Sequence, residues 1–165
     1  MSFQPDAPPR PEVVKCRWRV MAFCCGLGLD LGCGREKVHP LAVGVDFLPE
    51  AADLLWDIRQ GLPYADQAFD FVFSSHLLQD LPAPEAALAE WFRVLRPGGY
   101  LVLYLPHAAF APRLGEPGCP PAQKHDFLPE DLLALARRVG GLRLVQASEH
   151  DEDDEFSFQL VFQKQ

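Results

Sequence analysis

Basic side chains are scarce in this sequence. Fifteen lysines and arginines stand against 23 aspartates and glutamates among 165 residues, which gives a formal net charge of −8 at pH 7. Affinity for nucleic acid comes largely from basic side chains that neutralise phosphates. The charge balance therefore argues against a nucleic-acid partner.

Long apolar runs and paired cysteine motifs are also missing. No stretch approaches the roughly 18 apolar residues of a membrane helix, and the polar, proline-rich start MSFQPDAPPRPE is unlike a signal peptide. The five cysteines form no CxxC pair, so neither a disulfide framework nor a tetrahedral zinc site is expected. We therefore predict a cytoplasmic protein with no membrane span and no bound metal.

The rest of the composition is typical of one globular domain. Hydrophobic residues make up 48% of the chain and charged residues 23%, which are ordinary shares. Four of the 16 prolines lie in residues 1–11, which show no apolar periodicity. We predict a flexible leader over 1–11 and a single domain over 12–165.

Apolar runs alternate with amphipathic segments along the chain. The segment 84–95 has apolar residues at helical spacing and stops at Pro97-Gly98-Gly99, which predicts a helix between two buried strands. A strand, a helix and a second strand of this kind form a right-handed crossover between parallel neighbours. The parallel strands are predicted at 27–31, 42–46, 52–56, 69–73 and 100–105, two further helices at 11–23 and 129–139, and a final hairpin at 142–148 and 156–162.

This order predicts the α/β fold class: a three-layer, doubly wound, mostly parallel sheet that ends in an antiparallel hairpin. Only seven residues, 35–41, lie between Gly34 and the second strand, and the connection after the second strand is also short, so the crossover helices after the first two strands must be reduced. Ligands of such sheets bind beyond the carboxyl ends of the strands. The segment 106–129 follows the last parallel strand at that edge and contains six prolines, so we expect this stiff loop to cover the acceptor side of the pocket.

The residues that follow the first three strands favour a nucleoside ligand. Gly32 and Gly34 let the backbone approach a ligand closely because no Cβ intervenes, and no third glycine follows to complete a dinucleotide fingerprint. Asp46, at the tip of the second strand, can accept both hydroxyls of a ribose. Asp57 can accept the exocyclic amine of adenine, with the Ile58 N–H free to meet a ring nitrogen.

These features make the chain resemble the class I S-adenosylmethionine-dependent methyltransferases, from about Gly28 to Pro106. The resemblance lies in GLDLGCG, GVD, the pair Asp57-Ile58, AFDFVFSSHLLQDL and FRVLRPGGYLVLYLP, in this order and spacing. It implies a Rossmann-like methyltransferase fold, S-adenosyl-L-methionine as cofactor, and methyl transfer as the activity. The implied cofactor-binding residues are Asp30, Gly32, Gly34, Asp46, Asp57 and Ile58, and we expect Cys33, Phe47, Ser74 and His76 to border the same site.

Several of these residues also have a purely structural interpretation. Cys33 can fill space beside the glycine loop, Ser74 can belong to a simple turn, and His76 can cap the next helix through the backbone. The sequence alone leaves both interpretations of His76 open.

A narrower resemblance covers most of the chain from Gly26 onward. The segments SSHLLQDL, LVLYLPH, RLGEPG, KHDFLPEDLL and DEFSFQLVF are similar to those of small bacterial methyltransferase-domain proteins associated with surface-polysaccharide synthesis. This resemblance concerns the biological setting. A small-molecule or saccharide acceptor is suggested instead by the mix of His, Arg and Asp side chains in the loop 106–129. The sequence leaves the oligomeric state open, and a homodimer is compatible with it.

The candidate catalytic residues are His107, His125 and Asp126, which lie in or beside the proline-rich loop. A general base assists methyl transfer when the acceptor must lose a proton, and histidine titrates near neutral pH. The alternative is that these side chains hold the loop by hydrogen bonds.

Two other classes of function remain open at this point. One is a non-catalytic methyltransferase-like module that binds a partner protein, which a crevice filled by side chains such as Phe47 or His76 would favour. The other is a nucleotide-sugar or dinucleotide enzyme, which the missing third glycine disfavours.

Overall fold

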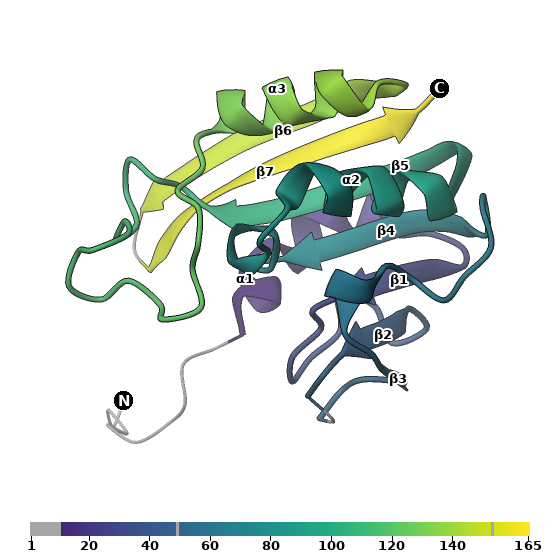
Figure 1. Cartoon of the computed structure of the whole chain (residues 1–165), viewed down its shortest axis with the longest axis horizontal. Helices are drawn as coiled ribbons and strands as arrows, with labels where there is room; N and C mark the ends of the chain where they lie inside the picture. Colours follow the sequence, from purple (N-terminus) through teal and green to yellow (C-terminus); the bar gives the residue numbers. More distant parts are fainter. Residues whose placement is uncertain (1–10, 49, 153) are drawn as a thin grey trace.

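The computed structural model describes residues 11–48, 50–152 and 154–165 (Figure 1). Seven strands form one sheet in the order β3-β2-β1-β4-β5-β7-β6. The strands are β1 (Gly28–Leu31), β2 (Val43–Asp46), β3 (Leu54–Leu55), β4 (Phe69–Ser75), β5 (Leu95–Pro106), β6 (Leu142–Glu152) and β7 (Glu155–Lys164). The helices are α1 (Glu12–Val20), α2 (Pro84–Val94) and α3 (Pro129–Val139), with short 3₁₀ helices at Met21–Phe23, Ile58–Gln60 and Leu78–Asp80.

The pairing confirms the predicted fold class. Strands β1 to β5 pair in parallel, and β7 lies antiparallel between β5 and β6. Within the described residues, no α-helix lies between β1 and β2 or between β2 and β3, which agrees with the reduced crossovers expected from the short connections. Of the predicted leader, residues 1–10 lie outside the described part of the chain, and Pro11 immediately precedes α1.

The helices cover the two faces of the sheet unequally. Alternate residues of β5 point to opposite faces: Leu101 and Leu103 pack in the cluster beneath α2 and α3, whereas Val102 and Tyr104 pack beneath α1. Figure 1 shows α2 and α3 in front of the sheet and α1 behind it. Three layers result, as the apolar strands predict, because a strand buried on both faces must be covered on both sides.

Two predicted boundaries differ from the structure. The strand β3 has only two residues, and β5 begins at Leu95, so the predicted stop 97–99 lies inside a bulged strand rather than in a loop. The hairpin strands are also longer than predicted, because residues 149–152 of the expected acidic turn continue to pair with β7. None of the helices that the structure describes is both long and apolar enough to cross a membrane.

Candidate functional site

Two adjoining cavities lie at the carboxyl ends of the parallel strands. The first, here called the β2 cavity, has a volume of about 410 Å³ and is lined by residues from β2, the 3₁₀ helix after β3, the turn after β4 and the loop 107–128. The second, the glycine-loop cavity, has a volume of about 540 Å³ and lies between the start of α1 and the loop after β1. Gly32, Leu48 and His76 line both cavities, so the two form one continuous cleft.

The buried carboxyl of Asp30 shapes the glycine loop. Asp30 is 1% exposed, and its Oδ2 accepts a hydrogen bond from the Val38 N–H at 2.5 Å. Burial raises the pKa of this carboxyl to about 7. Gly32 and Gly34 both have φ in the left-handed region, at +71° and +55°, which glycine adopts without steric cost. The turn that lines the cavity therefore depends on one buried acid and two glycines.

Asp46 connects the glycine loop to the end of β2. Its Oδ2 accepts from the Gly34 N–H at 2.8 Å and its Oδ1 from the Leu48 N–H at 2.9 Å. Each carboxylate oxygen can accept a second hydrogen bond, so Asp46 can still take the two hydroxyls of a ribose. Its neighbour Phe47 is 75% exposed and therefore does not fill the β2 cavity that it borders.

Asp57 has a partner that the sequence analysis did not anticipate. Its carboxylate accepts hydrogen bonds from the backbone N–H of Arg59 at 3.0 Å and from the guanidinium of the same residue at 2.8 and 2.9 Å. The guanidinium lowers the pKa of Asp57 to about 2. Asp57 and Ile58 both line the β2 cavity, but an adenine amine would have to share this carboxylate with Arg59.

The two serines at the end of β4 have different surroundings, and it is Ser75 rather than Ser74 that lines the cleft. The Ser74 hydroxyl is buried and donates to the Leu31 carbonyl at 3.1 Å, and Ser74 lines neither cavity. Ser75 lines the glycine-loop cavity instead, and its buried Oγ has no hydrogen-bond partner within the described residues. Cys33 lines the same cavity, and burial raises its pKa to about 12, which disfavours the thiolate form that a nucleophile needs.

Two buried oxygens after β4 were missed by the sequence analysis. The Asp80 Oδ1, in the β2 cavity, and the Gln79 Oε1, in a third cavity described below, have no hydrogen-bond partner among the described residues. Unpaired buried polar atoms are rare, and each of them calls for an explanation such as a ligand. Both residues lie in the segment SSHLLQDL that carries the family resemblance, but no periodic pattern or glycine motif gave either of them a role of its own.

The three candidate catalytic side chains hold the loop 107–128 in place. His107 Nε2 lies 2.8 Å from a Glu149 carboxylate oxygen, and His125 Nε2 lies 3.0 Å from the Leu81 carbonyl. Asp126 accepts from the Leu114 N–H and from Gln123 Nε2. None of the three lines either cavity of the cleft. Their contacts match the structural alternative stated for them above, and no group of three metal-ligating side chains occurs in the described ranges.

Replacing Asp30 with asparagine is expected to change how stability depends on pH. The folded-state pKa of Asp30 lies near 7 and its ordinary value is 3.8, so this group stabilises the fold fully below about pH 4, and that contribution is lost as the pH rises through 7. Between pH 4 and pH 7 the free energy of unfolding of the wild type should fall, relative to that of Asp30→Asn, by up to about 4 kcal/mol. Asparagine keeps the acceptor for Val38 N–H.

Urea denaturation at a series of pH values measures this difference. Asp53→Asn is the control, and its effect on the pH dependence of stability should have the opposite sign. The reason is that hydrogen bonds from Lys37 and the Gly44 N–H lower the pKa of Asp53. A stability difference between Asp30→Asn and wild type that stays constant from pH 4 to 7 would contradict the prediction.

Comparison with known proteins identifies the fold. Residues 29–103 match the family model of the methyltransferase domain. A SAM-dependent methyltransferase from Thermotoga maritima superposes with a TM-score of 0.73 at 20% identity, over 93% of this chain and 89% of that one. A Burkholderia thailandensis N-methyltransferase with bound S-adenosylhomocysteine gives 0.68 at 18% identity, over 94% and 77%. The chain therefore has the fold of the class I S-adenosylmethionine-dependent methyltransferases.

A curated relative is the demethylmenaquinone methyltransferase of Lactiplantibacillus plantarum. It is 33% identical over 102 residues, which are 50% of this chain and 43% of the relative. The chain thus spans less than half the length of the curated relatives that it matches.

Proposed function

We propose that this chain transfers a methyl group from S-adenosylmethionine to a small-molecule acceptor. The observation that carries the proposal is the continuous cleft at the carboxyl ends of the strands, with Gly32 lining both of its cavities and an unpaired buried oxygen in each, of Asp80 in the β2 cavity and of Ser75 in the glycine-loop cavity. A nucleoside with a charged amino-acid tail offers N–H and O–H donors to both cavities. The family-model match over 29–103 supports the same chemistry.

The residues of the β2 cavity would hold the adenosine part. Asp46 would accept the ribose hydroxyls with its free lone pairs, and the Ile58 N–H would meet a ring nitrogen of adenine. The exocyclic amine would find the unpaired Asp80 Oδ1 in addition to the Asp57 carboxylate that Arg59 already occupies. The exposed ring of Phe47 at the rim is available to cover the base.

The glycine-loop cavity would hold the methionine part. Gly32 and Gly34 allow the backbone to approach the ligand, with Asp30 and Cys33 supporting the loop from beneath. The unpaired Ser75 hydroxyl would bond the tail of the ligand, and His76, at the junction of the two cavities, would lie near the reacting end. When bound, the cofactor supplies an electrophilic sulfonium methyl group.

A small-molecule acceptor is favoured by the curated relatives that are named for quinone substrates and by the N-methyltransferase named for the small molecule 1,6-didemethyltoxoflavin. For a saccharide acceptor the support is the mix of His, Arg and Asp side chains in the loop 107–128. The cytoplasmic location proposed from the reduced cysteines is compatible with both acceptors.

Titration calorimetry with S-adenosylhomocysteine tests the proposal without knowledge of the acceptor. Asp46→Ala is expected to weaken binding by about 1.5–3 kcal/mol, because the ribose hydroxyls lose a charged acceptor. Asp66→Ala is the matched control, since Asp66 is an exposed partner of Arg93 outside the cleft. Folding of each variant is checked by circular dichroism. Absence of heat with folded wild-type protein at millimolar ligand would defeat the proposal.

A further inference from the structure

A third cavity meets the proposed cofactor cleft at His76. It has a volume of about 200 Å³ and lies between α1, the loop 107–128 and the start of β7. His76 lines all three cavities, and Glu12 lines both this cavity and the glycine-loop cavity. Pro112, Pro120 and Gln123 of the loop form part of its wall. A molecule in this cavity would therefore lie next to the reacting end of the cofactor.

The side chain of His76 is fixed on the sheet by several contacts. Its Nε2 lies 2.9 Å from the Ser157 hydroxyl, and its ring packs on the Tyr104 ring with centroids 5.3 Å apart. Its backbone has φ +49°, in the left-handed region that non-glycine residues seldom adopt. Burial lowers the pKa of His76 to about 3, which favours the neutral ring, and the Glu12 carboxylate lies 3.7 Å from its Nε2.

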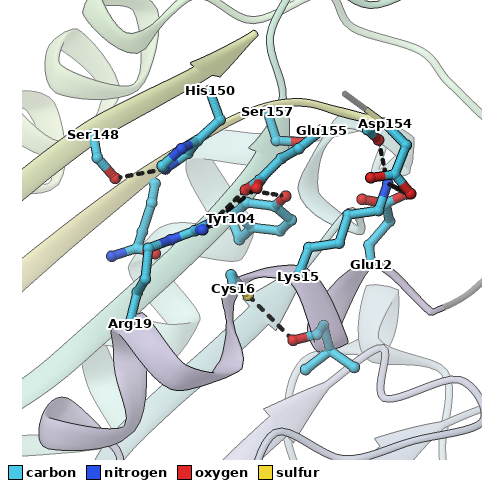
Figure 2. A network of polar contacts seen from close by, with 12 residues as sticks. Glu12, Lys15, Cys16, Arg19, Tyr104, Ser148, His150, Asp154, Glu155 and Ser157 are labelled. Carbon is cyan, nitrogen blue, oxygen red and sulfur yellow. Dashed lines mark hydrogen bonds and ion pairs between the residues drawn. The ribbon is translucent and has the colours of Figure 1, made fainter. Parts of the chain in front are cut away.

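A chain of hydrogen bonds determines which ring nitrogen of His76 carries the proton. The Glu155 carboxylate can only accept, so the Tyr104 hydroxyl donates to it, at 2.8 Å (Figure 2). We assign the Ser157 hydroxyl as a donor toward the Tyr104 oxygen, in line with the lowering influence that Ser157 has on the pKa of Tyr104. The Ser157 oxygen then accepts from His76 Nε2–H, 2.9 Å away. In neutral imidazole the other nitrogen, Nδ1, must therefore be the acceptor.

Gln79 supplies a second acceptor in the same cavity. Its Nε2 donates to the His76 carbonyl at 2.7 Å, which fixes the orientation of the amide and leaves Oε1 buried without a partner. Gln79 is 4% exposed. Two acceptors without donors of their own select a ligand that brings N–H or O–H groups.

The charges around the cavity select against an anion. Glu12 and Asp154 contribute two carboxylates, and Lys15 contributes one ammonium group. The Lys15 Nζ is already bound by the Glu12 carboxylate at 3.0 Å and by the Asp154 carbonyl at 2.5 Å (Figure 2). No free cation among the described lining residues is thus left to pair with a carboxylate or phosphate of the ligand.

We propose that the methyl acceptor binds in this third cavity as a small, neutral or cationic molecule that donates an N–H or O–H group to His76 Nδ1 and to Gln79 Oε1. The proposal rests on the function proposed above. The hydrogen-bond chain Glu155–Tyr104–Ser157 acts as a positioning device, since it keeps Nδ1 free to accept.

The tautomer of His76 can be measured without any ligand. Nitrogen NMR of histidine-labelled protein should show the Nε2–H tautomer, neutral down to about pH 5. Tyr104→Phe keeps the stacked ring but removes the hydroxyl, so both tautomers should become populated. An Nδ1–H tautomer in the wild type, or no change in Tyr104→Phe, would overturn the assignment of Nδ1 as the acceptor.

The class of acceptor is tested with three phenols of matched size in protein saturated with S-adenosylhomocysteine: tyramine, 4-hydroxybenzyl alcohol and 4-hydroxyphenylacetate. The cation and the alcohol should shift the His76 Nδ1 resonance, and the carboxylate should bind at least about tenfold more weakly because of the acidic rim. Gln79→Leu should weaken binding of the first two by about 5–10-fold, whereas Gln146→Leu on β6 should not.

Equal binding of the carboxylate, or no shift at His76 with any of the three phenols, would overturn the inference while leaving the cofactor site intact. Failure of S-adenosylhomocysteine to bind would instead overturn the proposed function.

Discussion

Replacing Arg19 with methionine is expected to lower the free energy of unfolding by about 3–5 kcal/mol, the usual effect of removing one partner of a buried ion pair. Arg19 on α1 pairs with Glu155 at the start of β7, and the two side chains are only 13% and 16% exposed. Figure 2 shows the guanidinium and the Tyr104 hydroxyl converging on this carboxylate. Burial alone would raise the pKa of Glu155, but the hydrogen bonds from Arg19 and Tyr104 lower it.

Urea denaturation at pH 7 measures the loss. Arg138→Met is the matched control, because Arg138 pairs with Glu85 on the surface, where the side chains are 54% and 52% exposed and such pairs contribute about 0–1 kcal/mol. The double variant Arg19→Met/Glu155→Leu should recover part of the stability, since no unpaired charge is left. A loss for Arg19→Met no larger than that for Arg138→Met would contradict the prediction.

The ion pair between Arg19 and Glu155 also links the stability of the fold to the shape of the candidate site, through α1. α1 contributes Glu12 to the glycine-loop cavity and both Glu12 and Lys15 to the third cavity. Arg19 is the residue that holds the other end of this helix against β7. Loss of the Arg19–Glu155 pair should therefore loosen α1. This should disturb the third cavity and the hydrogen-bond chain through Tyr104 before the sheet itself unfolds.

The sequence was sufficient to predict most of the fold because the strands are buried on both faces. Runs such as 69–73 and 100–105 are apolar almost throughout, as strands covered on both faces are, and the helix spacing of 84–95 then places the crossover. The start of β5 was missed because the Pro-Gly-Gly segment, a strong stop signal, is accommodated in a bulge beside Phe69. Leu95 pairs with Phe69 before the bulge and Tyr100 pairs with Phe71 after it, so the strand continues on both sides of the segment.

The cleft was predicted in position but not in every contact. Asp46 and the glycines come together at the cleft as expected because strand ends of a parallel sheet share one edge. Asp57 is paired with Arg59 instead, a contact between residues two apart that no pattern of apolar residues reveals. The pairing of Arg19 with Glu155 spans 136 positions, so only the packed structure could show it.

Trp91→Ala is the second substitution with a large expected effect, a loss of about 3–5 kcal/mol in the free energy of unfolding. Trp91 is fully buried on α2, in the larger of the two core clusters, between the helices and the sheet. Truncation removes its apolar surface from the core and leaves a cavity that rigid strands such as β5 cannot close. Trp18→Ala is the matched control, since Trp18 is 75% exposed on α1.

Trp91→Phe separates the packing of this side chain from its polarity. The buried Trp91 Nε1 has no hydrogen-bond partner within the part of the chain that the structure describes, so losing the N–H removes an unpaired donor while keeping an aromatic ring. The phenylalanine variant should therefore retain most of the stability that alanine loses, when both are measured by urea denaturation against wild type. If Trp91→Phe cost as much as Trp91→Ala, the N–H would have to be bonded in solution, and the packing argument for this residue would fail.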